Sequence, residues 1–194
     1  EIEYKQFYIP FKEALERDVS REQSVGKKVL RKFYERYFYE QYAKEIGYDS
    51  RLIRDANEKP DCIVIDLDGT VALHRNRLPF DWDKLGTDFF DPRMHHIIMT
   101  YVKTGVKLIF LTGRPESVRL ATETWIDSNL QTDYELIMRP VNDYRSGEIV
   151  KKELWEKYVE PYYNTICVFE DSNKCVDMWR DLGILTCQVA NGDY

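Results

Sequence analysis

The stretch "CIVIDLDGTVA", residues 62–72, decides the fold. Its apolar, β-branched start is typical of a buried strand, and this strand runs directly into Asp66. A second carboxylate follows at Asp68, and Gly69 permits a sharp backbone turn. We therefore expect two carboxylates at the end of a core strand, with the amide and hydroxyl of Thr70 beside them.

Further along the chain, short apolar runs alternate with stretches of helix-forming residues. The runs predict strands at residues 62–66, 106–112, 134–138, 165–169 and 184–189. The stretches between them predict helices at residues 92–104, 115–129, 148–158 and 173–182. This alternation is typical of an α/β fold, with a Rossmann-like parallel sheet covered by helices on both faces. Ligands of such sheets bind at the carboxyl ends of the strands.

The first 59 residues follow a different pattern. Residues 22–48 are rich in helix formers with apolar residues at i, i+3/i+4 spacing, which predicts one long amphipathic helix. "FKEALERDVS", residues 11–20, predicts a shorter helix before it. Residues 47–61 collect Gly, Asp, Asn and Pro, and they indicate a linker that ends near Pro60. We expect an N-terminal helical appendage at residues 1–59 and an α/β domain at residues 60–194.

Composition is that of a globular chain. With 194 residues, 43% hydrophobic and 32% charged, there is room for one domain with a core and a smaller appendage. No apolar run approaches the ~20 residues that span a bilayer, and the first ten residues lack the pattern of a signal peptide. The four cysteines form no CxxC pair, which indicates reduced core thiols. We therefore expect a cytoplasmic protein without membrane contact.

Charge is distributed unevenly along the sequence. Residues 1–59 contain 13 Lys and Arg against 12 Asp and Glu, whereas residues 60–194 contain 15 against 22. The acidic second part excludes a broad polyanion-binding surface there, because a long electrostatic footprint needs many cations facing phosphates. If this part acts on nucleic acid, it should hold only a short piece of it.

The ends of the predicted strands combine carboxylates, a hydroxyl and an ammonium group. This combination suits phosphoryl transfer, in which a carboxylate attacks phosphorus while Mg²⁺ and a cation offset the repulsion between two anions. A neighbouring acid then protonates the leaving oxygen, and water hydrolyses the aspartyl-phosphate. Mg²⁺ prefers one or two carboxylates together with waters and phosphate oxygens. The residues are Asp66 and Asp68 after the first strand, Thr112 and Gly113 after the second, Lys151 in a helix, and Glu170 and Asp171 after the fourth.

Each of these features alone also fits a commonplace structural role. Residues 66–69 fit an ordinary turn, residues 112–114 a helix cap, and residues 170 and 171 a charge pair at a helix N-terminus. Lys151 alone suits a solvated lysine. An EF-hand is weaker still, because its twelfth position would be Arg77 rather than Glu. Their order at successive strand ends favours the catalytic interpretation.

The same residues resemble the motifs of the haloacid dehalogenase-like (HAD) phosphotransferase superfamily. "DLDGT" is similar to its first motif, "LTGR" to its second, Lys151 to its third and "EDSN" to its fourth. The resemblance implies a HAD-type fold with Mg²⁺ as cofactor, and whether Glu170 joins Asp171 at the metal stays open. It implies Asp66 as nucleophile, Asp68 as general acid and base, Thr112 as phosphate ligand and Lys151 as charge-balancing lysine. The implied metal ligands are Asp66, Asp68 and Asp171, either without Glu170 or together with it.

Other stretches resemble a narrower family. "IMRPVNDYRSGEIVKKELW" (residues 137–155), "DMWRDLGI", "CQVANGDY" and "LPFDWDKLGTDFFDP" are similar to the 3′-phosphatase domain of bacteriophage polynucleotide kinase/3′-phosphatase. This resemblance spans nearly all of residues 60–194 and implies hydrolysis of 3′-terminal phosphates from DNA or RNA ends. It implies substrate binding by Gly113, Arg114, Arg139 and Arg145. Arginine is suited to this role because its planar guanidinium can bind a phosphate through two hydrogen bonds.

Some of these residues also fit a second role. Surface salt bridging would account for Arg139 and Arg145. Phe80, Trp82 and Phe89 fit either base stacking at an open entrance or, more ordinarily, packing against the core.

The segment "FYIPFKEALERDVSREQSVGKKVLRKFYERY", residues 7–37, resembles the tail of the kinase lobe that precedes the phosphatase in that family. The sequence lacks the phosphate-cradling loop GxxxxGK[ST] that a kinase of this type needs. We therefore expect the C-terminal part of a bifunctional 5′-kinase/3′-phosphatase, or a protein whose kinase partner is separate. A packing or self-association helix, giving a homo-oligomer, is an equal alternative.

Our interpretation is a Mg²⁺-dependent polynucleotide 3′-phosphatase that acts through an aspartyl-phosphate, in the host cytoplasm if a phage encodes it. One alternative is a HAD-type phosphomonoesterase for small molecules or nucleotides, which the acidic balance favours and the string "MRPVNDYR" opposes. Another is a non-catalytic module that binds nucleic acid ends. That module would be expected to lack one of the charged groups, and none is missing.

Overall fold

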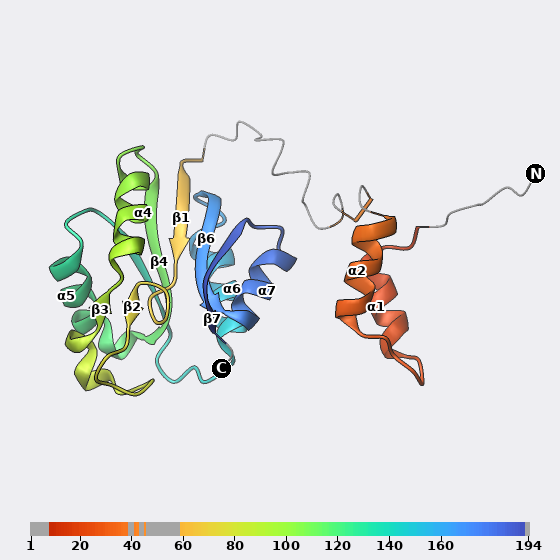
Figure 1. The fold of residues 1–194 in the computed structure, drawn as a ribbon, viewed down its shortest axis with the longest axis horizontal. Helices are drawn as coiled ribbons and strands as arrows, with labels where there is room; N and C mark the ends of the chain where they lie inside the picture. Colours follow the sequence, from red (N-terminus) through yellow and green to blue (C-terminus); the bar gives the residue numbers. More distant parts are fainter. Residues whose placement is uncertain (1–7, 39–40, 43–44, 46–58, 193–194) are drawn as a thin grey trace, which may run out of the picture. The chain divides into compact units, whose positions relative to one another are not determined.

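The structure, a computed structural model, describes residues 8–38, 41–42, 45 and 59–192. The chain divides into two compact units, Glu1–Asn57 and Glu58–Tyr194 (Figure 1). In the described part of the chain, no helix combines the length and the apolar composition that crossing a bilayer requires.

The first unit contains helix α1 (Phe11–Val19) and helix α2 (Lys27–Tyr37). Phe11, Tyr34 and Tyr42 are buried together between them, with edge-on ring contacts. The carboxylate of Glu45 accepts hydrogen bonds from the amides of Phe11 (2.6 Å) and Lys12 (3.1 Å). These amides have no partner inside α1, so the Glu45 side chain caps the start of that helix.

The prediction of one long helix over residues 22–48 is wrong. Before α2, the Asp18 carboxylate accepts hydrogen bonds from the amides of Val25 (3.0 Å) and Gly26 (2.9 Å), and Gly26 has a φ of 82°. The helix therefore begins only at Lys27. It ends at Tyr37, because Phe38 leaves the helical region at φ −133° and ψ 32°. Residues 41, 42 and 45 are helical again, and the predicted linker lies largely outside the described residues, at 46–58.

The second unit is built on a five-stranded sheet in the order β5-β4-β1-β6-β7, and every neighbouring pair is parallel. The predicted parallel α/β sheet is therefore confirmed. The second and fourth of these strands run well beyond their predicted ends, so Gly113, Arg114, Glu170 and Asp171 belong to strands rather than to the loops after them. The strands are β1 (Asp61–Ile65), β4 (Lys107–Pro115), β5 (Glu135–Arg139), β6 (Asn164–Ser172) and β7 (Thr186–Gly192).

Helices cover both faces of this sheet, as Figure 1 shows. Ile63 and Ile65 of β1 face the cluster that includes α4 (Pro92–Val102) and α5 (Arg119–Asn129). The alternate residues, Cys62 and Val64, face α6 (Gly147–Tyr158) and α7 (Asn173–Asp181). Successive strand residues point to opposite faces, so a run that is apolar throughout feeds two cores. A short 3₁₀ helix, η3 (Glu116–Val118), delays the start of α5 to Arg119.

An insertion separates β1 from α4. It contains the short antiparallel pair β2 (Ala72–Leu73) and β3 (Phe89–Phe90), and the 3₁₀ helix η2 (Trp82–Thr87) lies between them. Phe90 is buried and stacks on Trp125 of α5, with ring centroids 5.4 Å apart. This contact joins the insertion to the core beside the ends of β1 and β4.

Candidate active site

The turn after β1 places its first two carboxylates. The amide of Asp66 donates to the carbonyl of Phe169 in β6 (3.0 Å), which continues the sheet pairing. The carbonyl of Leu67 then accepts from the amides of Thr70, Val71 and Ala72. Gly69 adopts a φ of 83°, which a residue with a Cβ avoids, so the predicted turn at this glycine is confirmed.

Three buried carboxylates meet at the ends of β1 and β6. Oxygen atoms of Asp66, Glu170 and Asp171 all lie within 4.8 Å of one another. The ammonium of Lys151, from α6, lies 2.7 Å from Asp66 Oδ1 and 2.7 Å from Glu170 Oε2. We call these four side chains the acidic cluster. Sequence reasoning placed all four at one sheet edge, and the structure brings them together.

The acidic cluster holds more negative than positive charge. Burial raises the pKa of Asp66 well above its ordinary value, and the carboxylates of Glu170 and Asp171 raise it further against the attraction of Lys151. Burial alone would lower the pKa of Lys151, but attraction to Asp66 and Glu170 outweighs it and raises that pKa. The lysine therefore stays charged, and one ammonium faces three carboxylates.

The contacts within the acidic cluster suit a hard divalent cation. Oε1 of Glu170 accepts from the amides of Asp171 and Ser172, both at 3.2 Å, while its other oxygen binds Lys151. Oδ1 of Asp171 accepts from the hydroxyl of Thr70 at 3.3 Å. Carboxylate oxygens are the ligands that Mg²⁺ prefers, and a cation would offset the surplus negative charge. Asp66 and Asp171 fit this role best, because Glu170 is engaged by the lysine and two amides.

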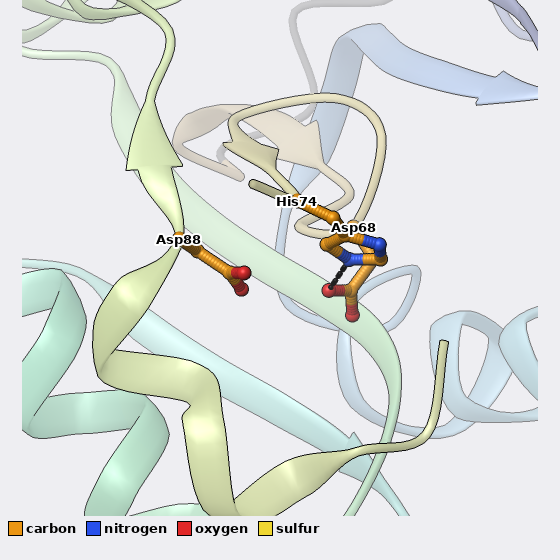
Figure 2. Close-up of side chains that lie close together, drawn as sticks. All are labelled: Asp68, His74 and Asp88. Carbon is orange, nitrogen blue, oxygen red and sulfur yellow. Dashed lines mark hydrogen bonds and ion pairs between the residues drawn. The ribbon is translucent and has the colours of Figure 1, made fainter. Parts of the chain in front are cut away.

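Asp68 lies in a different environment. The Arg114 guanidinium donates to both Asp68 oxygens at 2.8 Å, and Arg77 donates to Oδ1 at 2.5 Å. His74 Nε2 lies 2.8 Å from the same oxygen (Figure 2). Burial alone would raise the pKa of Asp68, but these hydrogen bonds and the two guanidinium charges outweigh it and hold the pKa far below its usual range. The Asp68 carboxylate is thus already neutralised and is not part of the acidic cluster, and its role as a metal ligand stays a prediction.

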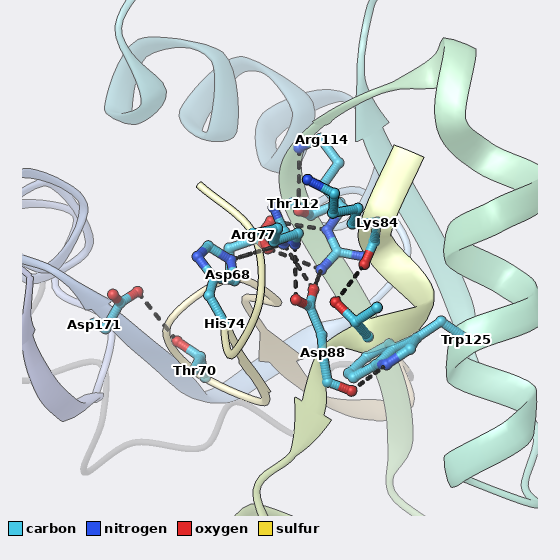
Figure 3. A network of polar contacts seen from close by, with 11 residues as sticks. Asp68, Thr70, His74, Arg77, Lys84, Asp88, Thr112, Arg114, Trp125 and Asp171 are labelled. Atoms are coloured by element: carbon cyan, nitrogen blue, oxygen red, sulfur yellow. Dashed lines mark hydrogen bonds and ion pairs between the residues drawn. The ribbon is translucent and has the colours of Figure 1, made fainter. Parts of the chain in front are cut away.

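A second carboxylate, Asp88, lies beside the same two arginines. We call Asp68, His74, Arg77, Asp88 and Arg114 the arginine cluster. Arg77 donates through Nε and a terminal nitrogen to the two Asp88 oxygens, both at 2.7 Å, and Arg114 adds a contact at 3.2 Å. The Trp125 indole donates to the Asp88 carbonyl at 3.0 Å (Figure 3). Oxygen and nitrogen atoms of Asp68, His74 and Asp88 lie close enough to hold a metal. We assign no metal there, because two buried guanidinium groups supply the positive charge.

Sequence reasoning missed three members of the arginine cluster: His74, Arg77 and Asp88. No motif marks them, since they lie on the insertion between β1 and α4 at irregular spacing. Arg77 directly precedes the stretch "LPFDWDKLGTDFF", and Asp88 lies within it. Their place at this stretch is the one signal in the sequence, and the interpretation of the stretch rested on its aromatic residues instead.

A cavity of about 740 Å³ opens above the acidic cluster. At its mouth, Phe80 is 79% exposed and its ring lies edge-on to Trp82, with centroids 5.8 Å apart. Phe89 is half exposed but lies outside this lining, where Arg75 covers its ring. The described residues that line the cavity include Asp66, Lys151, Glu170 and Asp171 of the acidic cluster, Asp68, His74 and Arg77, Pro79, Phe80 and Trp82, and Gly113, Arg139, Ser146 and Gly147.

Two of the four predicted substrate-binding residues line this cavity. Arg139 donates to the carbonyl of Gly113 (3.0 Å) and to those of Asp143 (3.1 Å) and Arg145 (2.7 Å), so its guanidinium is fixed beside the opening. Its remaining terminal nitrogen lies near both Gly113 and Gly147. An arginine held in this way is suited to a phosphate group.

The other two predicted substrate-binding residues lie elsewhere. Arg145 is exposed and pairs with Asp143 and Glu153, as the salt-bridge alternative expects. Arg114 is fully buried and absent from the described cavity lining, and its guanidinium holds Asp68, so its role in substrate binding stays a prediction. The Thr112 hydroxyl is fully buried as well, and it accepts from the Arg114 amide at 3.2 Å.

Comparisons with known proteins agree with this architecture. The chain is 34% identical over 142 residues to the "Putative bifunctional polynucleotide kinase/RNA ligase" of Autographa californica nuclear polyhedrosis virus. The aligned part covers 70% of this chain but only 20% of that relative. The chain therefore spans about a fifth of the length of this viral relative.

Solved structures show the same fold. A chain of a Pnkp1/Rnl/Hen1 complex matches with a TM-score of 0.67 and 34% identity, over 71% of this chain and 47% of that one. A chain of a Pnkp1/Rnl/Hen1 RNA repair complex matches with a TM-score of 0.68 and 26% identity, over 96% and 64%. A class C acid phosphatase from Bacillus anthracis, with a TM-score of 0.52 and 18% identity over 95% and 86%, shares the fold alone.

The family comparison covers the same part of the chain as the sheet and both clusters. Residues 60–194 match the model of the polynucleotide kinase PNKP phosphatase domain, so the resemblance to HAD polynucleotide phosphatases is confirmed. With more than half of its length in that match, the chain belongs to the HAD family of polynucleotide kinase PNKP phosphatase domains.

Proposed function

We propose that this phosphatase domain removes the 3′-terminal phosphate from a polynucleotide. The observation that carries the proposal is the placement of Asp66 beside Lys151 in a buried acidic cluster, under a cavity that has the exposed ring of Phe80 at its mouth, beside the half-buried Trp82. The cluster supplies a nucleophile with a fixed counter-charge, and the rings supply a surface for a nucleobase.

The proposed reaction begins with attack of an Asp66 carboxylate oxygen on phosphorus. An aspartyl-phosphate bond forms, the bond to the 3′ oxygen breaks, and that oxygen takes a proton from Asp68. Water then attacks the phosphorus and gives its proton to Asp68, which releases phosphate and restores Asp66. Lys151 holds a positive charge beside the attacking oxygen throughout.

Asp68 must carry a proton for the first of these steps, although the arginine cluster holds it ionised in the free protein. Arg77 lines the cavity, and its second terminal nitrogen has no hydrogen-bond partner among the described residues. We infer that a bound phosphate attracts Arg77 and so weakens its hold on Asp68, which raises the pKa of that carboxyl. The variant Asp68→Asn should then slow hydrolysis of a natural ester more than that of an activated aryl phosphate.

Asp66 and Asp171 are the proposed ligands of Mg²⁺, and Glu170 orients Lys151 beside them. When bound, the ion would supply Lewis-acid stabilisation of the charge on the phosphoryl oxygens. The surrounding residues of the chain keep the acidic cluster buried and exclude bulk water from one side of the cluster, and Lys151 offsets part of the charge of Asp66.

The substrate class is proposed from the relatives and from the cavity together. One relative bears the name of an RNA ligase and kinase, and two solved structures are named for complexes with Pnkp1, Rnl and Hen1, one of them an RNA repair complex. We propose RNA ends ahead of DNA ends on this ground. We also propose that the domain works together with a 5′-kinase, on the same polypeptide or a separate one.

The test is phosphate release from a 3′-phosphorylated oligonucleotide, in RNA and DNA form, with Mg²⁺ or with EDTA. We expect release that needs Mg²⁺ and that the variant Asp66→Asn abolishes while its circular dichroism spectrum stays unchanged. Release by Asp66→Asn at a rate near that of the unchanged protein would overturn the nucleophile assignment.

A small-molecule phosphomonoesterase is the second candidate, because residues 60–194 contain more Asp and Glu than Lys and Arg. The two functions separate on one comparison, kcat/KM for a 3′-phosphorylated oligonucleotide against that for a mononucleotide 3′-phosphate. Equal values for the two substrates would favour the second candidate.

A further inference from the structure

The outer face of α2 carries two parallel rows of side chains. Lys28, Lys32 and Arg36 follow one another at a spacing of four residues, and so do Val29, Phe33 and Tyr37. Residues four apart on a helix lie on one face, and the second row is offset by one residue from the first. Cations and apolar groups thus run side by side for about 12 Å, at a rise of 1.5 Å per residue.

Both rows lie outside the buried side of the helix. At its inner edge the Phe33 ring contacts Tyr34 and Phe38, with centroids 6.2 and 5.8 Å apart, and the Arg36 guanidinium lies 5.4 Å from the centre of the Tyr37 ring. Tyr34 is buried against α1, with Leu30 and Phe38 packed beside it. Val29, Phe33 and Tyr37 remain 55%, 47% and 51% exposed, and all three cations are exposed as well. Exposed aromatic rings in a small helical unit are unusual unless a ligand or a partner covers them.

The charge of α2 indicates what kind of ligand would cover these rings. Five of its eleven residues are Lys or Arg and one is Glu. Lys28, Lys32 and Arg36 form no ion pair with another residue in the described part of the chain. Like charges four residues apart destabilise a helix, so an anion bound along this row of three cations would stabilise α2. The second unit has the opposite balance, with 22 Asp and Glu against 15 Lys and Arg in residues 60–194.

We infer that this face of α2 binds a single-stranded polynucleotide, with phosphates along the cationic row and bases on Phe33 and Tyr37. Aromatic rings next to a cationic track are the combination that holds single strands without sequence preference, because every base has a face that can stack. The inference deepens the proposed function, since it adds a second contact for the same substrate class. It concerns binding alone and does not depend on hydrolysis.

The test is the salt dependence of binding to a labelled, unphosphorylated RNA strand of about 20 nucleotides, followed by fluorescence anisotropy on the whole chain. Each phosphate neutralised on a single strand contributes about 0.7 to the slope of log K against log salt. The variant Lys28→Gln/Lys32→Gln/Arg36→Gln should therefore lower that slope by about 2. Phe33→Leu keeps an apolar side chain but removes the ring, and it should weaken binding roughly fivefold or more with the slope unchanged.

A matched control removes the same charge from the same unit. Lys12, Arg17 and Arg21 are exposed and lie outside α2, so Lys12→Gln/Arg17→Gln/Arg21→Gln should keep the slope and the affinity nearly unchanged. Equal losses in the two triple variants would overturn the inference, because they would reflect net charge alone. Unchanged binding in the α2 variant would overturn it as well.

Two further measurements separate RNA binding by α2 from membrane binding and from hydrolysis. Binding of the chain to vesicles with anionic lipid, but not to RNA, would assign the face to a membrane surface and overturn the proposal. Phosphate release from a 3′-phosphorylated trinucleotide is measured in parallel, because so short a strand should depend little on α2. Normal RNA binding without any release would leave the α2 surface standing while the proposed function fails.

Discussion

The ammonium nitrogen of Lys151 lies 2.7 Å from Oδ1 of Asp66, across 85 residues of sequence, and both side chains are buried. The same nitrogen lies 2.7 Å from Glu170. A buried charge is tolerated only while its partner is present, so these side chains depend on one another. The contact also fixes α6 against the ends of β1 and β6.

Replacing this lysine should therefore destabilise the fold as well as stop turnover. We expect Lys151→Met to lower the free energy of unfolding by about 3–5 kcal/mol, because two buried carboxylates lose their counter-charge. Mg²⁺ should restore part of this loss by binding the same carboxylates. Urea unfolding with EDTA and with Mg²⁺ measures both effects.

Lys152 offers the matched control for this variant. It is the next residue, and its ammonium pairs with Glu156 at 3.7 Å on the solvent side of α6. Exposed pairs of this kind contribute little, so Lys152→Met should cost roughly 0.5 kcal/mol or less. Similar losses for the two variants would contradict the buried ion pair.

The arginine cluster should affect how the free energy of unfolding changes at acid pH. Burial would raise the pKa of Asp68, but Arg114, His74 and Arg77 outweigh it and lower that pKa. A lowered carboxyl pKa contributes stability above the unfolded value of about 3.9, and this contribution is lost as the pH falls toward the folded value. Asp68→Asn should be less stable than the unchanged protein at pH 7, and should lose less stability from about pH 4 to pH 2. Urea unfolding at several pH values tests this. If the free energy of unfolding fell equally in both proteins between pH 4 and pH 2, the prediction would be contradicted.

The sequence was informative about the sheet because periodicity and topology act together. A run such as that of β1 is apolar on both faces only when helices cover both, and parallel strands bring their carboxyl ends to one edge. Asp66, Glu170 and Asp171 could therefore be placed side by side from their positions after apolar runs. Lys151 followed from its place in the HAD-like motif order.

The arginine cluster could not be foreseen in this way. Arginine is mostly exposed, so nothing in the sequence marks Arg77 and Arg114 as buried. Their burial depends on how the insertion folds back and sets Asp88 opposite Asp68, which is a tertiary event without local periodicity. The start of α2 was misplaced for a related reason, since the Asp18 side chain takes the amides of Val25 and Gly26.

Gly192 supports the acidic cluster from β7. A Cβ on this residue would lie 2.9 Å from the backbone carbon, the carbonyl oxygen and Oδ2 of Asp171. We expect Gly192→Ala to displace Asp171 and to lower Mg²⁺ affinity and phosphate release at least tenfold. Gly86 is the control, because a Cβ there meets nothing within 4 Å, and Gly86→Ala should leave both unchanged. Isothermal titration with Mg²⁺ measures the affinity, and normal affinity in Gly192→Ala would show that Asp171 is not a ligand.

The effect of Mg²⁺ should depend on pH in a defined direction. Burial and the neighbouring carboxylates raise the pKa of Asp66, so at low pH a proton competes with the cation. At a concentration of 100 times its Kd, Mg²⁺ should stabilise the fold by about 2.7 kcal/mol near pH 7. The same concentration should give a smaller rise in Tm at pH 5, and Asp171→Asn should lose most of the rise at both. Equal shifts at the two pH values, measured by calorimetry, would contradict the assignment.

Phe80 allows stability and function to be separated at one position. Its φ of 70° lies in the left-handed region, which costs a residue with a side chain roughly 1–2 kcal/mol, while its ring is exposed at the cavity mouth. Phe80→Gly should therefore raise Tm slightly and yet lower kcat/KM for a 3′-phosphorylated oligonucleotide about tenfold, with less effect on an aryl phosphate. Asn142, at a φ of 65°, lies outside the described cavity lining, so Asn142→Gly should leave kcat/KM unchanged for both substrates. If Phe80→Gly changed the two substrates equally, the ring would have no part in recognising a base.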